Sequence, residues 1–222
     1  MSAKAKALLM TLMVFGGIIW YSLGHPGLDK VTELKARWAE KSKITNTKKP
    51  KTRNTKVGSS IGKVIDQYNG VNVYYNGSVG NVKGRNVTKD GYNLGLKYQC
   101  VEFAKRYYYE RFGHKMPDSY GHAKDFYDTN LGSGQFNKAR KMWQFANGGT
   151  TRPLPEDLVI IGPSSYNSFG HLFIITESHD SRVAFVQQNP GANNPSRGSY
   201  KLIQRNGRWT IDAPNVLGWL RK

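Results

Sequence analysis

The sequence contains one cysteine, Cys100, and its setting favours a role as a nucleophile. Val101, Ala104 and Tyr108 follow it at helical spacing, which predicts a helix over residues 100–112 that begins at the cysteine. In the first turn of a helix, unpaired backbone N–H groups and the positive end of the dipole stabilise a thiolate. We therefore expect the pKa of Cys100 to lie below the value of about 8.5 for a free cysteine. The competing interpretation is a small buried apolar residue, the usual role of a lone cysteine.

A thiol nucleophile needs a base of near-neutral pKa, and histidine is the side chain that provides one. His171 opens the apolar run 172–175 directly after a loop rich in serine, asparagine and glycine. A histidine at the entrance of a buried strand can be held rigidly with one ring edge exposed, although a structural role is the alternative. The other four histidines lie in the N-terminal segment, after a helix end, in a polar loop and at a turn: His25, His114, His122 and His179.

The strand that begins at His171 is predicted to form a hairpin with the next apolar run, residues 182–188, through a turn at residues 178–181. If residues 178–180 form the turn, His171 lies opposite Gln187, and an error of one residue in the turn brings Gln188 or its neighbours there instead. A side-chain oxygen could then accept the imidazole Nδ1–H and orient the base, as an Asn or Asp does in cysteine proteases.

The other elements are predicted from periodicity and turn residues. Two weaker helical candidates follow the helix over 100–112, at residues 125–130 and 136–145. Helices that precede an antiparallel sheet predict an α+β fold, with the helices packed on the sheet. The sheet is expected to contain strands at residues 71–75, 158–161, 171–177, 182–188, 202–204, 209–211 and 216–220, two of them joined by a turn at Asn206-Gly207.

The 222 residues include 33 Lys and Arg against 15 Asp and Glu, a formal net charge of +18. This excess favours anionic partners such as nucleic acid, acidic lipid or anionic polymers. Hydrophobic residues make up 38% of the chain and aromatic residues 12%, so wholesale disorder is excluded. One cysteine excludes an intramolecular disulfide and a Cys-based zinc cluster. The sequence also lacks an acidic cluster of the kind that binds calcium, so we expect no metal and no cofactor.

The N-terminal part of the chain contains an uncharged apolar run, residues 7–24. As a helix it would be roughly 27 Å long, close to the thickness of the hydrocarbon core of a bilayer. We predict a single-pass membrane anchor over residues 1–24, with the rest outside the cytoplasm, in the periplasm or at the cell surface. A cleaved signal peptide is the alternative, because small residues such as Ser22 precede the end of the run. Residues 25–56 are basic and poor in apolar side chains, which predicts a flexible tether, and a folded domain is expected over residues 57–222.

Residues 57–222 resemble the CHAP family of cysteine, histidine-dependent amidohydrolases/peptidases. They are most similar to its branch of glutathionylspermidine and trypanothione synthetase amidase domains, which implies a papain-like fold. The matching stretches surround the candidate nucleophile, the candidate base and the segments that frame them: Gly70–Tyr74, Gln99–Ala104, Leu154–Leu158, Gly170–Thr176, Gln188–Asn189 and Leu217–Trp219.

The resemblance implies that Cys100 is the nucleophile and His171 the general base in amide hydrolysis through an acyl-enzyme. The family usually has a carboxylate at the position of Gln187. The Gln187 amide oxygen can orient the imidazole but cannot stabilise imidazolium by charge, and Asn189 is expected to share the orienting role. The candidates for the oxyanion hole are the backbone N–H of Cys100 and two side chains expected nearby, Gln99 and Asn93.

We therefore predict a membrane-anchored cysteine amidase or peptidase. Its substrate is expected to be a cell-wall peptide or a glutathione–polyamine conjugate of the glutathionylspermidine type. The positive charge favours the anionic cell-wall polymer, and the resemblance favours the conjugate. The alternative is a catalytically weakened CHAP-fold module that binds cell-wall polymer, because Gln187 replaces the usual carboxylate. Net charge is the one feature that supports nucleic-acid binding, so we do not expect nucleic acid as a partner.

Overall fold

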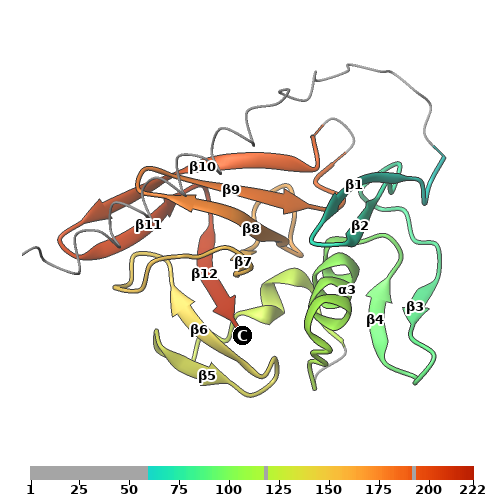
Figure 1. Cartoon of the computed structure of the whole chain (residues 1–222), viewed down its shortest axis with the longest axis horizontal. Coiled ribbons are helices and arrows are strands. Elements are labelled where there is room, and N and C mark those ends of the chain that lie inside the picture. Colours follow the sequence, from blue (N-terminus) through green and yellow to red (C-terminus); the bar gives the residue numbers. More distant parts are fainter. Residues whose placement is uncertain (1–59, 118–119, 192–193) are drawn as a thin grey trace, which may run out of the picture. The chain divides into compact units, whose positions relative to one another are not determined.

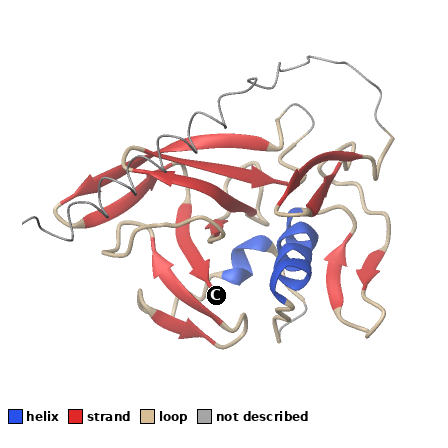
Figure 2. Ribbon diagram, viewed as in Figure 1, coloured by secondary structure: helices blue, strands red, loops and turns tan. Residues whose placement is uncertain are grey.

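The structure, a computed structural model, describes residues 60–117, 120–191 and 194–222. These residues form twelve strands, one α-helix and one 3-10 helix (Figures 1 and 2). In chain order the elements are β1 Val64–Tyr68, β2 Val71–Tyr74, β3 Arg85–Val87, β4 Asn93–Leu96, α3 Cys100–Phe112, η1 Ala123–Phe126, β5 Gln135–Asn137, β6 Met142–Ala146, β7 Leu158–Ile161, β8 His171–His179, β9 Arg182–Gln187, β10 Arg197–Arg205, β11 Arg208–Asp212 and β12 Val216–Arg221.

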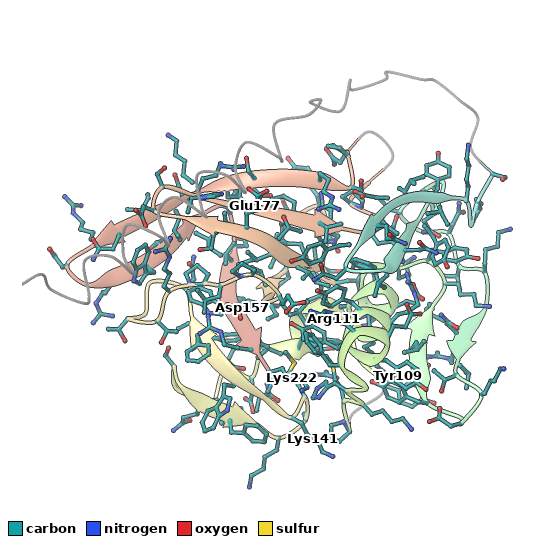
Figure 3. The ribbon with its side chains drawn as sticks, in the orientation of Figure 1. Tyr109, Arg111, Lys141, Asp157, Glu177 and Lys222 are labelled. Carbon is teal, nitrogen blue, oxygen red and sulfur yellow. The ribbon has the colours of Figure 1, made fainter. Side chains whose placement is uncertain are left out.

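Eight of the strands form one antiparallel sheet, in the order β11-β10-β9-β8-β7-β12-β6-β5. The last strand, β12, lies between β7 and β6, so the end of the chain completes the middle of the sheet. There the buried carboxylate of Asp157, just before β7, pairs with Arg221 of β12 at 2.7 Å. Figure 3 shows Asp157 near the centre of the domain. The pairs β1-β2 and β3-β4 form two separate two-stranded sheets.

The central strands are buried on both faces, which explains their continuous apolar sequences. Successive side chains of a strand point to opposite faces. Accordingly, Leu172 and Ile174 of β8 belong to one core cluster, whereas Phe173 and Ile175 belong to another. The first cluster also contains the buried side chains of α3 and η1, such as Phe103. The two clusters are therefore separated by the sheet.

The helix α3 fixes the position of the candidate nucleophile. It begins at Cys100 and ends before Gly113, whose φ of 61° lies in the left-handed region that glycine adopts readily. Residues 102–108 are all buried, because the helix packs against β4, β2 and β8 (Figure 1). The prediction of a helix over 100–112 is confirmed in both of its bounds.

The predicted α+β fold with N-terminal helices packed on the sheet is wrong, because the described residues are mostly β-structure around one α-helix. Residues 136–145 form parts of the β5-β6 hairpin, in which burial alternates along β6 with Met142 inside and Trp143 half-exposed. Residues 125–130 contain the end of η1 followed by a turn. In both segments, apolar residues at helix-like spacing belong to short structures that tertiary packing stabilises.

The structure confirms the predicted strands, with shifts of one or two residues at several ends and a longer β10. The predicted strands were those near residues 71–75, 158–161, 171–177, 182–188, 202–204, 209–211 and 216–220. The turn at Asn206-Gly207 is confirmed as the connection between β10 and β11. These segments combine β-branched or aromatic residues, which favour strands, with flanking turn residues. Pairing with the adjacent strand of a hairpin adds to this preference for extended structure.

The prediction of a single-pass membrane protein is contradicted. Within the described residues, no helix is both long and apolar enough to cross a membrane. The prediction was based on apolar length, which cleaved signal peptides can share. The segments assigned to the anchor and the tether, residues 1–24 and 25–56, lie outside the described residues, and the domain boundary at residue 57 stays a prediction.

Candidate active site

Cys100 lies at the first position of α3, partly buried against the core. Burial raises the pKa of the Cys100 thiol to about 11, and the neighbouring backbone N–H groups of Leu172, Val101 and Cys100 reduce that rise only in part. The expected lowering of this pKa is therefore wrong for the resting site, because the loss of water outweighs the effect of the helix N-terminus.

His171 is the first residue of β8 and pairs with Ile161 of β7. The chain enters the strand through Gly170, whose φ is 75°. A Cβ at that position would lie 2.4 Å from the carbonyl oxygen of Ile161 and 3.1 Å from the backbone nitrogen of Lys124. Glycine thus lets the loop before His171 pack directly between β7 and η1, which fixes where the imidazole enters the site.

The side chain of Gln187 holds the imidazole of His171, with 3.0 Å between Nε2 of the histidine and Oε1 of the glutamine. Gln187 also donates from Nε2 to the carbonyl of Pro195 at 3.0 Å, which fixes Oε1 as the atom that faces His171. The histidine therefore donates from Nε2–H and has its lone pair on Nδ1. The predicted bond to Gln187 is present, but it uses Nε2–H and not Nδ1–H.

Burial lowers the pKa of His171 to about 4, and the hydrogen bond to Gln187 offsets only part of that change. The imidazole is consequently neutral at pH 7. With a thiol pKa of about 11 at Cys100, the two groups rest as an uncharged thiol and an uncharged imidazole. An uncharged Gln187 adds no field that would favour imidazolium.

The hairpin that brings Gln187 to His171 differs in register from the prediction. Its turn is formed by residues 180–181, and a bulge lies between Ile175 and Glu177. Gln187 is paired with Phe173, so the predicted direct pairing with His171 is wrong by two positions. The side chains of His171 and Gln187 still meet, because diagonal neighbours on one face of a sheet are within reach of long side chains.

Cys100 and His171 line one cleft, with a volume of about 500 Å³. Gln99 and Asn189 also line it, and much of the remaining wall is apolar: Val79, Val82, Leu96, Val101, Ala123 and Phe169. A second cleft, of about 480 Å³, is also lined by His171, together with Gln187, Asn189 and Tyr200 among others. His171 therefore lines both clefts, and Cys100 is among the lining residues of the first.

In a comparison with known protein families, the CHAP domain family matches residues 89–189, a range that contains Cys100, His171 and Gln187. Residues 89–189 are a CHAP domain. Trypanothione synthetase of Crithidia fasciculata is 33% identical over 147 residues, which cover 62% of this chain and 22% of that protein. The bifunctional glutathionylspermidine synthetase/amidase of Escherichia coli (strain K12) is 27% identical over 138 residues, which cover 57% of this chain and 22% of that protein. The similarity thus spans less than a quarter of each relative.

Among solved structures, the wild-type endolysin LysIME-EF1 is 23% identical, with a TM-score of 0.36 and coverage of 64% of this chain and 60% of that chain. The family match and the two curated relatives support a relationship of residues 89–189 to a family of hydrolytic amidases and peptidases.

Gln99 and Asn189 of the CHAP domain bind each other and do not reach His171. Gln99 donates from Nε2 to the carbonyls of Val79 and Asn81, at 3.0 and 2.8 Å, and accepts at Oε1 from Asn189 at 2.7 Å. Both hydrogens of the Gln99 amide are therefore engaged with backbone carbonyls. Asn189, expected to share the orientation of the imidazole, instead orients Gln99.

Asn93, the other side chain considered for the oxyanion hole, is not among the residues that line the cleft. It begins β4, and its side-chain oxygen accepts from Gly95 N–H and from Arg85. Of the predicted oxyanion set, Cys100 and Gln99 line the cleft and Asn93 does not, and the role of the Cys100 N–H stays a prediction.

Sequence reasoning missed the role of Gln188, which is completely buried beside the site. Its oxygen accepts from Tyr74 N–H at 2.8 Å, and its nitrogen donates to the Gln99 carbonyl at 3.1 Å and to Glu102 Oε2 at 2.8 Å. Glu102 also forms a buried ion pair with Arg106, at 2.6 Å. Gln188 thus links the end of β9 to the first turn of α3. Neighbouring residues of a strand point to opposite faces, and this period could have indicated from the sequence that Gln187 and Gln188 have different surroundings.

No group of three or more His, Cys, Asp or Glu side chains is arranged to hold a metal ion within residues 60–117, 120–191 and 194–222.

Proposed function

We propose that the CHAP domain hydrolyses an amide bond with Cys100 as nucleophile and His171 as base. The thiol proton moves to Nδ1 of His171 while Sγ attacks the amide carbon. The tetrahedral intermediate collapses to a thioester, and His171 returns the proton to the leaving amine. Water then attacks the thioester, with His171 again as base, and releases the acid. The sum is one amide and one water converted to one acid and one amine.

The observation that carries this proposal is the cleft that Cys100 and His171 line together. Nδ1 of His171 has the lone pair that a base requires, because Nε2–H is donated to Gln187. Since the resting pair is uncharged, we infer that proton transfer accompanies attack on bound substrate. The backbone N–H of Cys100 is our candidate to stabilise the oxyanion.

For the substrate we propose the amide of a peptide acid. A glutathione–polyamine conjugate is favoured by the relative whose name includes a glutathionylspermidine amidase. A cell-wall peptide is favoured by the formal charge of +18, which suits an anionic polymer.

The test is incubation of the full chain with glutathionylspermidine and, separately, with purified peptidoglycan, followed by mass analysis of the products. Cys100→Ala should abolish product formation. His171→Ala should lower kcat by about 100-fold to 10,000-fold, the usual contribution of a general base. His179→Ala is the matched control, because His179 is an exposed histidine at the far end of the same hairpin, and it should keep parental turnover. Turnover that survives Cys100→Ala would refute the mechanism.

A second candidate function is a binding module for cell-wall polymer with little or no turnover. It is favoured by the neutral Gln187 beside His171, together with the lowering of the pKa of His171 to about 4. Peptidoglycan that is retained by the protein in a pull-down, without new products in the mass spectrum, would support this function over hydrolysis.

A further inference from the structure

The cleft that contains Cys100 has a nearly uncharged wall with one exception. Arg85 is the one Asp, Glu, Lys or Arg side chain among the described residues that line it. Because the other described wall residues are apolar or uncharged polar ones, apart from His122 and His171, the guanidinium group adds a positive potential that favours a negatively charged ligand.

Arg85 is linked closely to the nucleophile by backbone pairing. It begins β3 and is paired with Leu96 of β4. The carbonyl of Leu96 accepts from Gln99 N–H at 2.9 Å, one residue before Cys100. Figure 1 shows β4 beside α3. The position of the guanidinium relative to the thiol is thus set by regular structure.

The side chain of Arg85 is also held in place. It donates from one terminal nitrogen to the Asn93 side-chain oxygen at 3.2 Å, and its guanidinium carbon lies 5.2 Å from the centre of the Tyr120 ring. An arginine that is already oriented loses less conformational entropy when it binds a ligand. A guanidinium group has five N–H donors, so most of them remain available.

Arg85 carries a charge that the described residues do not neutralise, since no carboxylate among them lies within ion-pair distance of it. Arg197, the arginine of the second cleft, is the contrast: Asp66 binds its guanidinium at 2.8 and 3.0 Å. Among the described residues, the guanidinium group in the cleft beside Cys100 therefore has no carboxylate partner, whereas the one in the second cleft has one.

From this geometry we infer that Arg85 is a specificity residue that binds a carboxylate on the acyl half of the substrate. A protonated amine, such as the polyamine half of a conjugate, is repelled by the same charge and is directed away from Arg85. The inference rests on the proposed function for the identity of the acyl half. Two sources supply the carboxylate: a γ-glutamyl residue of a glutathione-type peptide, or an acidic residue of a wall peptide.

The experiment measures binding, so it does not depend on turnover. Full-length Cys100→Ala protein is titrated with γ-glutamyl-alanyl-glycinamide and with 4-aminobutyryl-alanyl-glycinamide, which differ only in the carboxylate. A second pair, alanyl-γ-D-glutamyl-lysinamide and alanyl-4-aminobutyryl-lysinamide, represents the wall peptide. We expect the carboxylated member of one pair to bind about tenfold more tightly, the size of one charged hydrogen-bonded contact at a solvent-accessible site. The pair that shows the preference identifies the source.

Added to the same background, Arg85→Gln should abolish that preference, and Arg85→Lys should keep part of it because the charge remains without the planar fork. Arg205→Gln is the matched control, since it removes the same charge from the exposed end of β10 and should leave the preference unchanged. Equal binding within both pairs, no binding at all, or a preference that survives Arg85→Gln would overturn the inference. A preference that depends on Arg85, in a parent protein that cleaves neither amide, would uphold the inference and refute the proposed hydrolysis.

Discussion

Gln187 and Gln188 are neighbours with the same side chain, and the two faces of the sheet give them different surroundings. Gln187 is half-buried and touches His171 and a backbone carbonyl. Gln188 is completely buried and joins β9 to β2 and to the first turn of α3. One face thus supplies the partner of the candidate base, and the other anchors the helix that carries the candidate nucleophile. The comparison separates orientation of the imidazole from stability of the domain.

The largest expected effect is on stability, from Gln188→Leu. The substitution removes a hydrogen bond from the Tyr74 N–H, from the Gln99 carbonyl and from Oε2 of Glu102. The Gln99 carbonyl keeps a second backbone donor, whereas the Tyr74 N–H and Glu102 Oε2 lose the partner that Gln188 provides. A buried polar group left without its partner costs about 1–3 kcal/mol and a charged one more, so we expect the free energy of unfolding to fall by about 3 kcal/mol. Urea denaturation measures it. Gln187→Leu is the matched control and should cost less than about 1 kcal/mol, and an equal loss in both variants would contradict the comparison.

A smaller effect is expected on the titration of the site, from Gln187→Glu. In the parent, with pKa values of about 4 for His171 and about 11 for Cys100, alkylation by iodoacetamide should rise steadily from pH 7 to pH 10 as thiolate forms. A carboxylate beside His171 favours imidazolium and raises its pKa by about 1–3 units. The imidazolium then lowers the pKa of the thiol, so the alkylation rate should be higher near pH 7 and depend less on pH. Identical profiles of parent and variant would show that residue 187 does not act on the imidazole.

The smallest effect is expected on turnover, from Gln187→Leu. The variant loses the hydrogen bond that holds Nε2–H, so His171 is free to rotate and to change tautomer. Since one neutral hydrogen bond contributes about 1 kcal/mol, we expect kcat to fall roughly fivefold to tenfold. Steady-state kinetics on the better substrate provides the measurement, at a urea concentration where the fold is intact. Unchanged kcat would mean that Gln187 does not orient the base during turnover.

Much of the local structure was predictable because it depends on nearby residues. The helix over 100–112 and the hairpin turn at Asn206-Gly207 are encoded by spacing, a closing glycine and turn residues. The helical interpretation of residues 136–145 failed because two short strands and a turn placed apolar residues at similar intervals. The alternation in β6 is visible only once its neighbours β5 and β12 are in place.

The sequence by itself determined which residues could do chemistry: a lone cysteine at a helix start, a histidine at a strand entrance and a nearby glutamine. Tertiary structure alone decided how they work together. The bulge in β8 sets the diagonal contact between His171 and Gln187, and the carbonyl of Pro195 fixes which atom of Gln187 faces the ring. Burial reversed the expected shift in the pKa of Cys100, because desolvation depends on everything packed around the sulfur and not on the helix that it begins.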